Sequence, residues 1–143
     1  MNRYKEIRTA SQDTAKIYRE TFESLSDLRE FFLDSFDCSE IETISNDYTF
    51  FTLVDETLES KGLKYTISYV HETNKVELYL SGQTRKTNDQ FKAILGLEGG
   101  LDWIYMFVLS EDYEMEEEDE NEDVYGKAIS YMEFIDTEIE DIL

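Results

Sequence analysis

A buried stripe can be traced along the first quarter of the chain at spacings of three and four residues. Its members are Ile17, Thr21, Leu25, Leu28, Phe32 and Ser35 or Phe36. Such spacing places side chains on one face of an α-helix, so a helix is predicted here. Thr9 and Gln12 form a capping-box pattern at its start, and Ser24 and Ser26 could divide it into two helices.

Strict alternation replaces the helical spacing in the middle of the chain. In LKYTISYV (63–70), large apolar residues alternate with smaller or polar ones, and HETN and KVELYLS follow. This pattern predicts a β-hairpin with a polar turn. The segment before it, 48–62, starts like a strand and ends like a helix closed by Gly62, so both interpretations stay open.

Two further elements are expected before residue 110. Thr87 and Gln90 form a second capping-box pattern ahead of a short apolar run, and Gly96 can end the resulting helix. A loop follows. The continuous apolar run WIYMFVL (103–109) then predicts a central strand covered on both faces.

The last segment returns to helical spacing. An amphipathic helix is predicted over about 124–142, with an apolar stripe of Val124, Ala128, Tyr131, Ile135, Ile139 and Ile142. No internal repeat or second core is visible. We therefore expect one α+β domain spanning 1–143, with one or more N-terminal helices, a small mainly antiparallel sheet and this C-terminal acidic helix.

Composition supports a folded body in spite of a large charge. Of the 143 residues 41% are apolar and 14% aromatic, while the formal net charge is -21. There is no apolar run long enough to span a membrane, and the N-terminal residues lack the apolar centre of a signal peptide. We expect a cytoplasmic protein, in the host cytoplasm if a phage encodes it; the single cysteine, Cys38, agrees with a reducing compartment.

The negative charge is concentrated at the C-terminal end. Residues 111–143 hold fifteen acidic residues and one basic residue, for a net of -14, whereas the first 110 residues have a net of -7. The block 111–123 contains ten carboxylates and no basic residue, and it is predicted to be an acidic loop or a frayed helix start. The protein is therefore expected to have an acidic pole.

This charge predicts a basic protein as the partner. Carboxylates three or four residues apart on a helix lie about 5–6 Å from each other, and a basic groove could accept such a row in place of phosphates. Direct binding to nucleic acid or to an anionic membrane is disfavoured, because both need basic residues. The predicted contact residues are Glu111, Asp112, Tyr113, Glu114, Glu116, Glu117, Glu118, Asp119, Glu120, Glu122, Asp123, Tyr125, Glu133, Asp136 and Glu140.

Tyrosines flank the acidic block. Tyr113 and Tyr125 stand among carboxylates and are interpreted as exposed contact residues, since tyrosine is enriched at interfaces. Tyr105 and Tyr131 are interpreted as core or half-buried packing residues. The alternative for the whole block is an acidic tail that only keeps the protein soluble.

No arrangement of residues indicates catalysis. His71 is the only histidine and is predicted to be a solvated turn residue, and Cys38 could be a nucleophile only if His71 approached it. The glycines of LGLEGGLD (95–102) match no phosphate-binding pattern. We therefore expect no enzyme activity, no catalytic residue and no cofactor.

Part of the acidic block has the spacing of the first ligands of a calcium-binding loop. Asp119, Asn121 and Asp123 stand at alternate positions, as the first ligands of an EF-hand do. Val124 stands where that loop needs glycine, and Ser130 where it needs a bidentate glutamate. No metal site is therefore predicted.

The small size, acidic excess and absence of a catalytic motif resemble phage-encoded DNA-mimic inhibitors of the anti-CRISPR and anti-restriction type. The resemblance is compositional, covers chiefly 111–143 and assigns no role to any single residue. It implies a stoichiometric inhibitor that occupies the nucleic-acid-binding groove of a host defence nuclease or effector complex. The alternatives are an immunity protein that neutralises a basic toxin, and an adaptor whose acidic segment is only solubilising.

Overall fold

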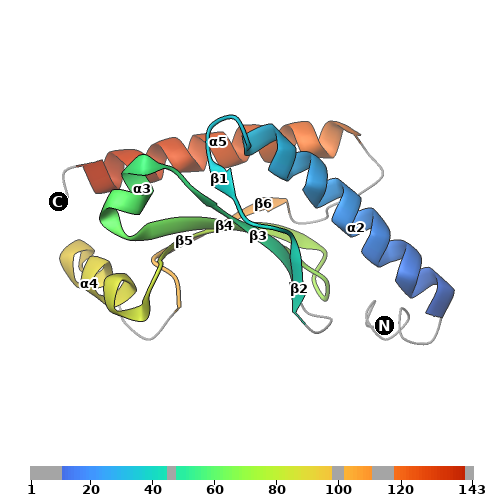
Figure 1. Cartoon of the computed structure of the whole chain (residues 1–143), viewed down its shortest axis with the longest axis horizontal. Helices are drawn as coiled ribbons and strands as arrows, with labels where there is room; N and C mark the ends of the chain where they lie inside the picture. The colour runs from blue at the N-terminus through green and yellow to red at the C-terminus, as the bar shows by residue number, and fades with distance from the viewer. Residues whose placement is uncertain (1–10, 45–47, 98–101, 111–117, 141–143) are drawn as a thin grey trace.

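An antiparallel sheet lies beneath two long helices in the computed structural model (Figure 1). The structure describes residues 11–44, 48–97, 102–110 and 118–140, with side chains from residue 22 in the first range and from 124 in the last. Helices α2 (Ser11–Phe32) and α5 (Glu118–Glu140) cover one face of the sheet. The predicted α+β class, with a mainly antiparallel sheet and a C-terminal helix, is confirmed.

The sheet is built from neighbouring antiparallel strands. Its order is β1-β3-β4-β5-β6, and β2 also pairs with β3. The strands are β1 (Asp37–Cys38), β2 (Glu42–Ile44), β3 (Tyr48–Val54), β4 (Leu63–Val70), β5 (Lys75–Gly82) and β6 (Tyr105–Ser110).

The predicted hairpin is confirmed with its turn. Strands β4 and β5 pair from Leu63 opposite Gly82 to Val70 opposite Lys75. Asn74 closes the turn in the left-handed region at φ 58°, a conformation that asparagine tolerates better than most residues. The hydroxyl of Tyr69 donates a hydrogen bond to the Asn74 side chain, which ties the turn to β4.

Segment 48–62 is a strand followed by a helix, so each interpretation holds for one part. The strand β3 ends at Val54 and helix α3 (Glu56–Lys61) begins one residue later. Gly62 has φ 71° and donates its backbone N–H to the carbonyl of Glu59, which ends the helix as expected.

Helix α4 (Arg85–Leu95) begins one turn before its predicted start. The hydroxyl of Thr84 accepts the N–H of Thr87, so Thr84 is the N-cap and Thr87 lies inside the first turn. The capping-box prediction at Thr87 was therefore wrong in register. Gly96, at φ 73°, ends the helix as predicted.

Helix α2 is continuous, so Ser24 and Ser26 do not divide it. The stripe of Leu25, Leu28 and Phe32 is buried as predicted. Phe36, rather than the exposed Ser35, packs against the core after the helix. Thr9 lies outside the described residues, as do the side chains of Gln12, Ile17 and Thr21.

Residues 105–109 of the predicted strand 103–109 lie in β6, which is the last strand of the described sheet and not a central strand. On one side, Phe107 stacks on Tyr131 of α5 with ring centroids 4.3 Å apart. On the other side, Met106 is only half-buried. The run is apolar on both faces of the strand. One face packs against helix α5, and the other lies beside the aromatic Tyr79 on the open face of the sheet.

Helix α5 begins earlier than predicted, at Glu118, so residues 118–123 of the acidic block form a helix start, the second of the two predicted alternatives, and not a loop. The predicted stripe is buried at Val124, Ala128, Ile135 and Ile139, and Met132 joins it. Ile142 lies outside the described residues.

The core lies between the sheet and the α2–α5 layer. The side chains of alternate strand positions point into it, including Phe51, Leu53, Tyr65, Ile67 and Leu78, all at most 1% exposed. The intervening positions form the opposite, open face. Over the part of the chain that the structure describes, no helix is long and apolar enough to cross a membrane.

Candidate functional site

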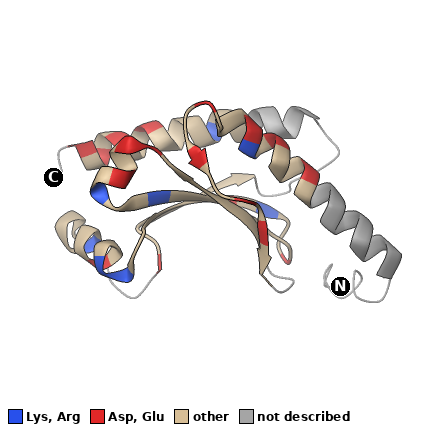
Figure 2. Ribbon diagram, in the orientation of Figure 1, with Lys and Arg blue, Asp and Glu red and all other residues tan. Residues whose placement is uncertain are grey.

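Charge is unevenly distributed over the fold. Acidic side chains gather on α5, on α3 and on the turn between α2 and β1, whereas α4 carries basic Arg85, Lys86 and Lys92 beside Asp89 (Figure 2). The helix layer therefore presents negative charge, and the α4 corner is locally positive.

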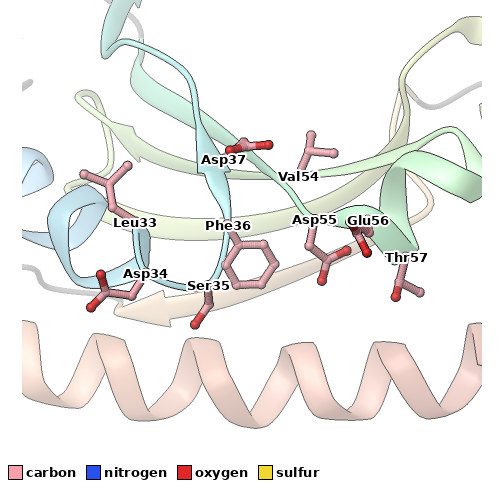
Figure 3. A pocket seen from close by; sticks show the side chains of 9 residues that line it. All are labelled: Leu33, Asp34, Ser35, Phe36, Asp37, Val54, Asp55, Glu56 and Thr57. Carbon is pink, nitrogen blue, oxygen red and sulfur yellow. The ribbon is translucent and has the colours of Figure 1, made fainter.

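A hollow of about 400 Å³ opens between the turn after α2 and the start of α3 (Figure 3). Residues 33–37 and 54–57 line it, and we call it the acidic hollow. Four of the nine lining residues are acidic: Asp34, Asp37, Asp55 and Glu56. In Figure 3 the side chains of Asp34 and Asp55 point toward the side on which α5 runs.

The carboxylate of Asp55 is held in place by the helix that it caps. Its Oδ1 accepts the backbone N–H of Leu58 at 2.8 Å. A side-chain oxygen is a favourable acceptor there, because the first turn of a helix leaves N–H groups without intrahelical partners. The position of this charge is therefore set by the backbone of α3.

Asp136 of α5 is held from the core side of the same surface. The hydroxyl of Tyr65 donates a hydrogen bond to its Oδ1 at 3.1 Å. Burial raises the pKa of Asp136, the bond from Tyr65 lowers it, and the negative charges of Asp55 and Glu133 raise it further. The pKa of Asp136 therefore depends on the charge of Asp55, which lines the acidic hollow, and on that of Glu133 in its own helix.

The structure places only part of the predicted contact set. Glu133, Asp136 and Glu140 lie exposed along α5, as predicted. The backbone of the middle group is helical, but its side chains are outside the described part of the structure: Glu118, Asp119, Glu120, Glu122 and Asp123. The whole of the first group lies outside the described residues: Glu111, Asp112, Tyr113, Glu114, Glu116 and Glu117.

Tyr125 corrects one expectation. Predicted to be an exposed contact residue, it is half-buried and its ring stacks on Phe31 of α2, with centroids 4.2 Å apart and planes within 8°. It lies one position after the buried Val124, at the border of the apolar stripe. Its ring therefore joins the two helices instead of facing a partner fully.

His71 corrects a second expectation, because it is buried rather than solvated. It is 2% exposed, and its Nε2 lies 2.7 Å from the hydroxyl of Thr49, which is itself 3.1 Å from the hydroxyl of Thr43. Tyr69 packs edge-on against the imidazole. The polar sequence around His71 obscured this, since only pairing of β3 with β4 brings Thr49 beside the turn.

Cys38 and His71 do not form a nucleophile and base pair. Cys38 pairs with Leu53 on β3, whereas His71 bonds to Thr49, four residues along the same strand. At roughly 3.4 Å per residue these points are on the order of 14 Å apart. Burial raises the pKa of the Cys38 thiol, Arg29 lowers it and Asp37 raises it, so the reactive thiolate is disfavoured.

Metal ligands do not gather in the described ranges, where no group of three or more His, Cys, Asp or Glu side chains could hold an ion. Residues 119, 121 and 123, considered above as calcium ligands, lie in helix α5. A helix does not provide the loop that an EF-hand site requires.

The sequence analysis missed a second hollow, of about 320 Å³, on the open face of the sheet. Aromatic and small side chains line it: Tyr48, Phe50, Thr66, Ser68, Tyr79 and Trp103. We call it the aromatic trough. Part of its signal was present in the hairpin alternation, where the residues between the large apolar positions of 63–70 were described only as smaller or polar.

Comparison with known proteins gives a family and no nearer relative. No curated protein and no solved structure matches the chain. A family described as "Domain of unknown function (DUF7000)" matches residues 1–99, which include strands β1 to β5 and helices α3 and α4. Since this match spans well over half of the 143 residues, the chain belongs to the DUF7000 family.

Proposed function

We propose that this protein is a stoichiometric inhibitor that binds a basic protein surface through the acidic hollow and the acidic face of α5. One observation carries the proposal: Asp55, at the N-cap of α3, and Asp136 of α5 are each fixed by a hydrogen bond, and the negative charge of Asp55 contributes to the raised pKa of Asp136. A cationic partner would relieve this repulsion.

Fixed carboxylates favour binding for a second reason. Ordering a mobile side chain at an interface costs about 0.5–1.5 kcal/mol, and part of that cost is already met for Asp55 and Asp136. The net charge of -21 adds long-range attraction that speeds association with a basic partner. The proposed partner is a nucleic-acid-binding nuclease or effector complex, whose basic groove accepts carboxylates in place of phosphates.

The test combines affinity capture with matched charge substitutions. The acidic-surface variant carries Asp55→Asn, Glu133→Gln and Asp136→Asn; asparagine caps a helix about as well as aspartate, so α3 should persist. The control variant removes three exposed charges away from this surface: Glu72→Gln, Asp89→Asn and Asp102→Asn. Both variants change the net charge by the same amount.

Wild type and control should retain the same partner from a bacterial lysate, identified by mass spectrometry, and competing duplex DNA should release it. The acidic-surface variant should bind the purified partner roughly tenfold more weakly, as expected for three charges at about 0.5 kcal/mol each. If the control variant bound the partner equally weakly, net charge alone would explain the loss of affinity. A partner that duplex DNA does not displace would rule out mimicry of nucleic acid and favour toxin neutralisation.

A further inference from the structure

The aromatic trough forms because small side chains on β4 lie between large aromatic side chains on β3 and β5. On the open face, small Thr66 and Ser68 of β4 form the floor, with Phe50 of β3 beside Ser68 and Tyr79 of β5 beside Thr66. The walls stand two strand spacings apart, about 9.5 Å. Trp103 extends the wall next to Tyr79, with ring centroids 6.2 Å apart and planes at 51°. The trough is therefore a built concavity rather than a flat sheet surface.

Carboxylates flank this trough on both sides in the same row of the sheet. Glu42 pairs with Phe50, and Glu77 pairs with Ser68, so both side chains project from the open face. The hydroxyl of Tyr79 donates a hydrogen bond to Oε1 of Glu77 at 2.5 Å. That bond holds a negative charge beside the ring of Tyr79.

The lysines of β4 and β5 that project from this face stand at the ends of the trough. Lys75 pairs with Val70, one row beyond Glu77, and Lys64 pairs with Ser81, one row beyond Tyr79. Neither lines the trough. The charges in its central row are negative, while its walls are aromatic faces.

We propose that the aromatic trough binds a small organic cation, an ammonium group with alkyl or aryl substituents. The faces of tryptophan and tyrosine attract such cations through the ring quadrupole, and the apolar substituents bury against the same rings. Glu42 and Glu77 supply opposite charge, which would repel an anionic ligand. A volume of about 320 Å³ lies at the lower end of the range for small-molecule sites.

This site is separate from the acidic surface, because the sheet lies between the α2–α5 layer and the open face. It is therefore independent of the inhibitor proposal. The acidic-surface variant should bind the organic cation as wild type does, so either proposal can fail without the other.

Trp103 supplies the readout, since the chain contains one tryptophan. Choline is titrated into the full-length protein at constant ionic strength, and its neutral isostere 3,3-dimethylbutan-1-ol is titrated in parallel. Choline should produce a saturable change in Trp103 fluorescence, and the isostere should bind roughly tenfold more weakly. Equal affinities would overturn the cation proposal, and the lack of a saturable change with choline would overturn the site.

Variants then locate the binding. Glu77→Gln and Tyr79→Leu should each weaken choline binding about three- to tenfold, while Tyr79→Phe, which keeps the ring, should weaken it less. Phe22→Leu is the matched aromatic control, since Phe22 is 50% exposed on α2. Thermal melts identify variants that fail to fold, and Glu77→Gln changes no packing volume. Unchanged affinity in both Glu77→Gln and Tyr79→Leu would overturn the assignment.

Discussion

The hydroxyl of Tyr65 donates a hydrogen bond to Oδ1 of Asp136, 3.1 Å away, and so joins the middle of β4 to the exposed face of α5. The ring of Tyr65 is 1% exposed, and its hydroxyl also lies 3.4 Å from the carbonyl of Met132. Burial raises the pKa of Tyr65, and the charge and hydrogen bond of Asp136 raise it further, so the phenol stays a donor. One carboxylate of the acidic surface is thus fixed by a core residue.

Asp136→Asn should stabilise the fold at neutral pH. Because the pKa of Asp136 is raised on folding, the folded state binds more protons than the unfolded state between the ordinary carboxyl pKa and the raised value. The stability contributed by this group therefore falls as pH rises through that window and stays low above it. Asparagine removes this penalty while still accepting the bond from Tyr65.

Urea unfolding of wild type and Asp136→Asn across pH checks this prediction. The gain should be full at pH 7, should shrink as pH falls through the raised pKa of Asp136, and should vanish below the ordinary carboxyl pKa, where Asp136 is protonated in both states. A gain that does not change with pH would contradict the electrostatic explanation. Asp89→Asn, on α4, serves as the control.

Tyr65→Phe should cost about 1 kcal/mol of folding free energy, because it removes one hydrogen bond and keeps the buried ring. The loss should be smaller in the Asp136→Asn background, where the acceptor is neutral, and a double-mutant cycle in urea measures that coupling. Tyr48→Phe, at a 42% exposed ring, should change stability by less than about 0.5 kcal/mol. Equal losses in both backgrounds would show that Tyr65 and Asp136 are not coupled.

Local patterns predicted the elements whose cause is local. Alternation over 63–81 fixed the β4–β5 hairpin, because each side chain must face either the core or the open face. Gly62 and Gly96 marked two helix ends, because a left-handed residue is needed there. The start of α4 was predicted one turn too late. Thr84 and Thr87 are both suitable N-cap residues, and in the structure the Thr84 hydroxyl accepts the N–H of Thr87.

Sites that combine residues from several strands could not be predicted from the sequence, because strand order was not known. His71 stands in a polar turn, and nothing near it in sequence shows that Thr49 lies within hydrogen-bonding distance. The aromatic trough likewise combines residues from β3, β4, β5 and the segment before β6. The acidic surface was predicted in part, because Glu133 and Asp136 lie on the outer side of an amphipathic helix, but the contribution of Asp55 requires the fold.

Thr49→Val should destabilise the protein by about 1–3 kcal/mol. The substitution keeps the shape of the side chain but removes the hydroxyl 2.7 Å from Nε2 of the buried His71. Thr43→Val is the control, because Thr43 is exposed at the other end of the same chain of hydrogen bonds and should cost less than about 0.5 kcal/mol. Similar costs for the two variants, measured in urea, would contradict a specific role for the Thr49–His71 bond.

Cys38 should react slowly with a disulfide reagent at neutral pH. Burial raises its thiol pKa, Arg29 partly offsets this, and the nearby charge of Asp37 raises the pKa again. The pseudo-first-order rate should therefore keep rising above the ordinary thiol pKa, and Asp37→Asn should increase the rate at pH 8. Asp34→Asn is the matched control. A rate that levels off at or below the ordinary thiol pKa would contradict this prediction.

Two glycines should respond oppositely to alanine. At Gly126, in the middle of α5, a new Cβ meets no atom within 4 Å, so Gly126→Ala should stabilise the fold by about 0.5–1 kcal/mol by restricting the unfolded chain.

At Gly82 the new Cβ would lie 2.3 Å from the backbone nitrogen of Asn88 and 2.8 Å from the carbonyl oxygen of Thr84. These atoms belong to the first turn of α4 and cannot yield as a flexible side chain does, and the Gly82 N–H also donates to the Asn88 side chain at 3.1 Å. Gly82→Ala should therefore cost about 3 kcal/mol, the upper end of overpacking effects. Urea midpoints of the two variants should move in opposite directions. A neutral Gly82→Ala would mean that α4 does not pack this closely against the end of β5.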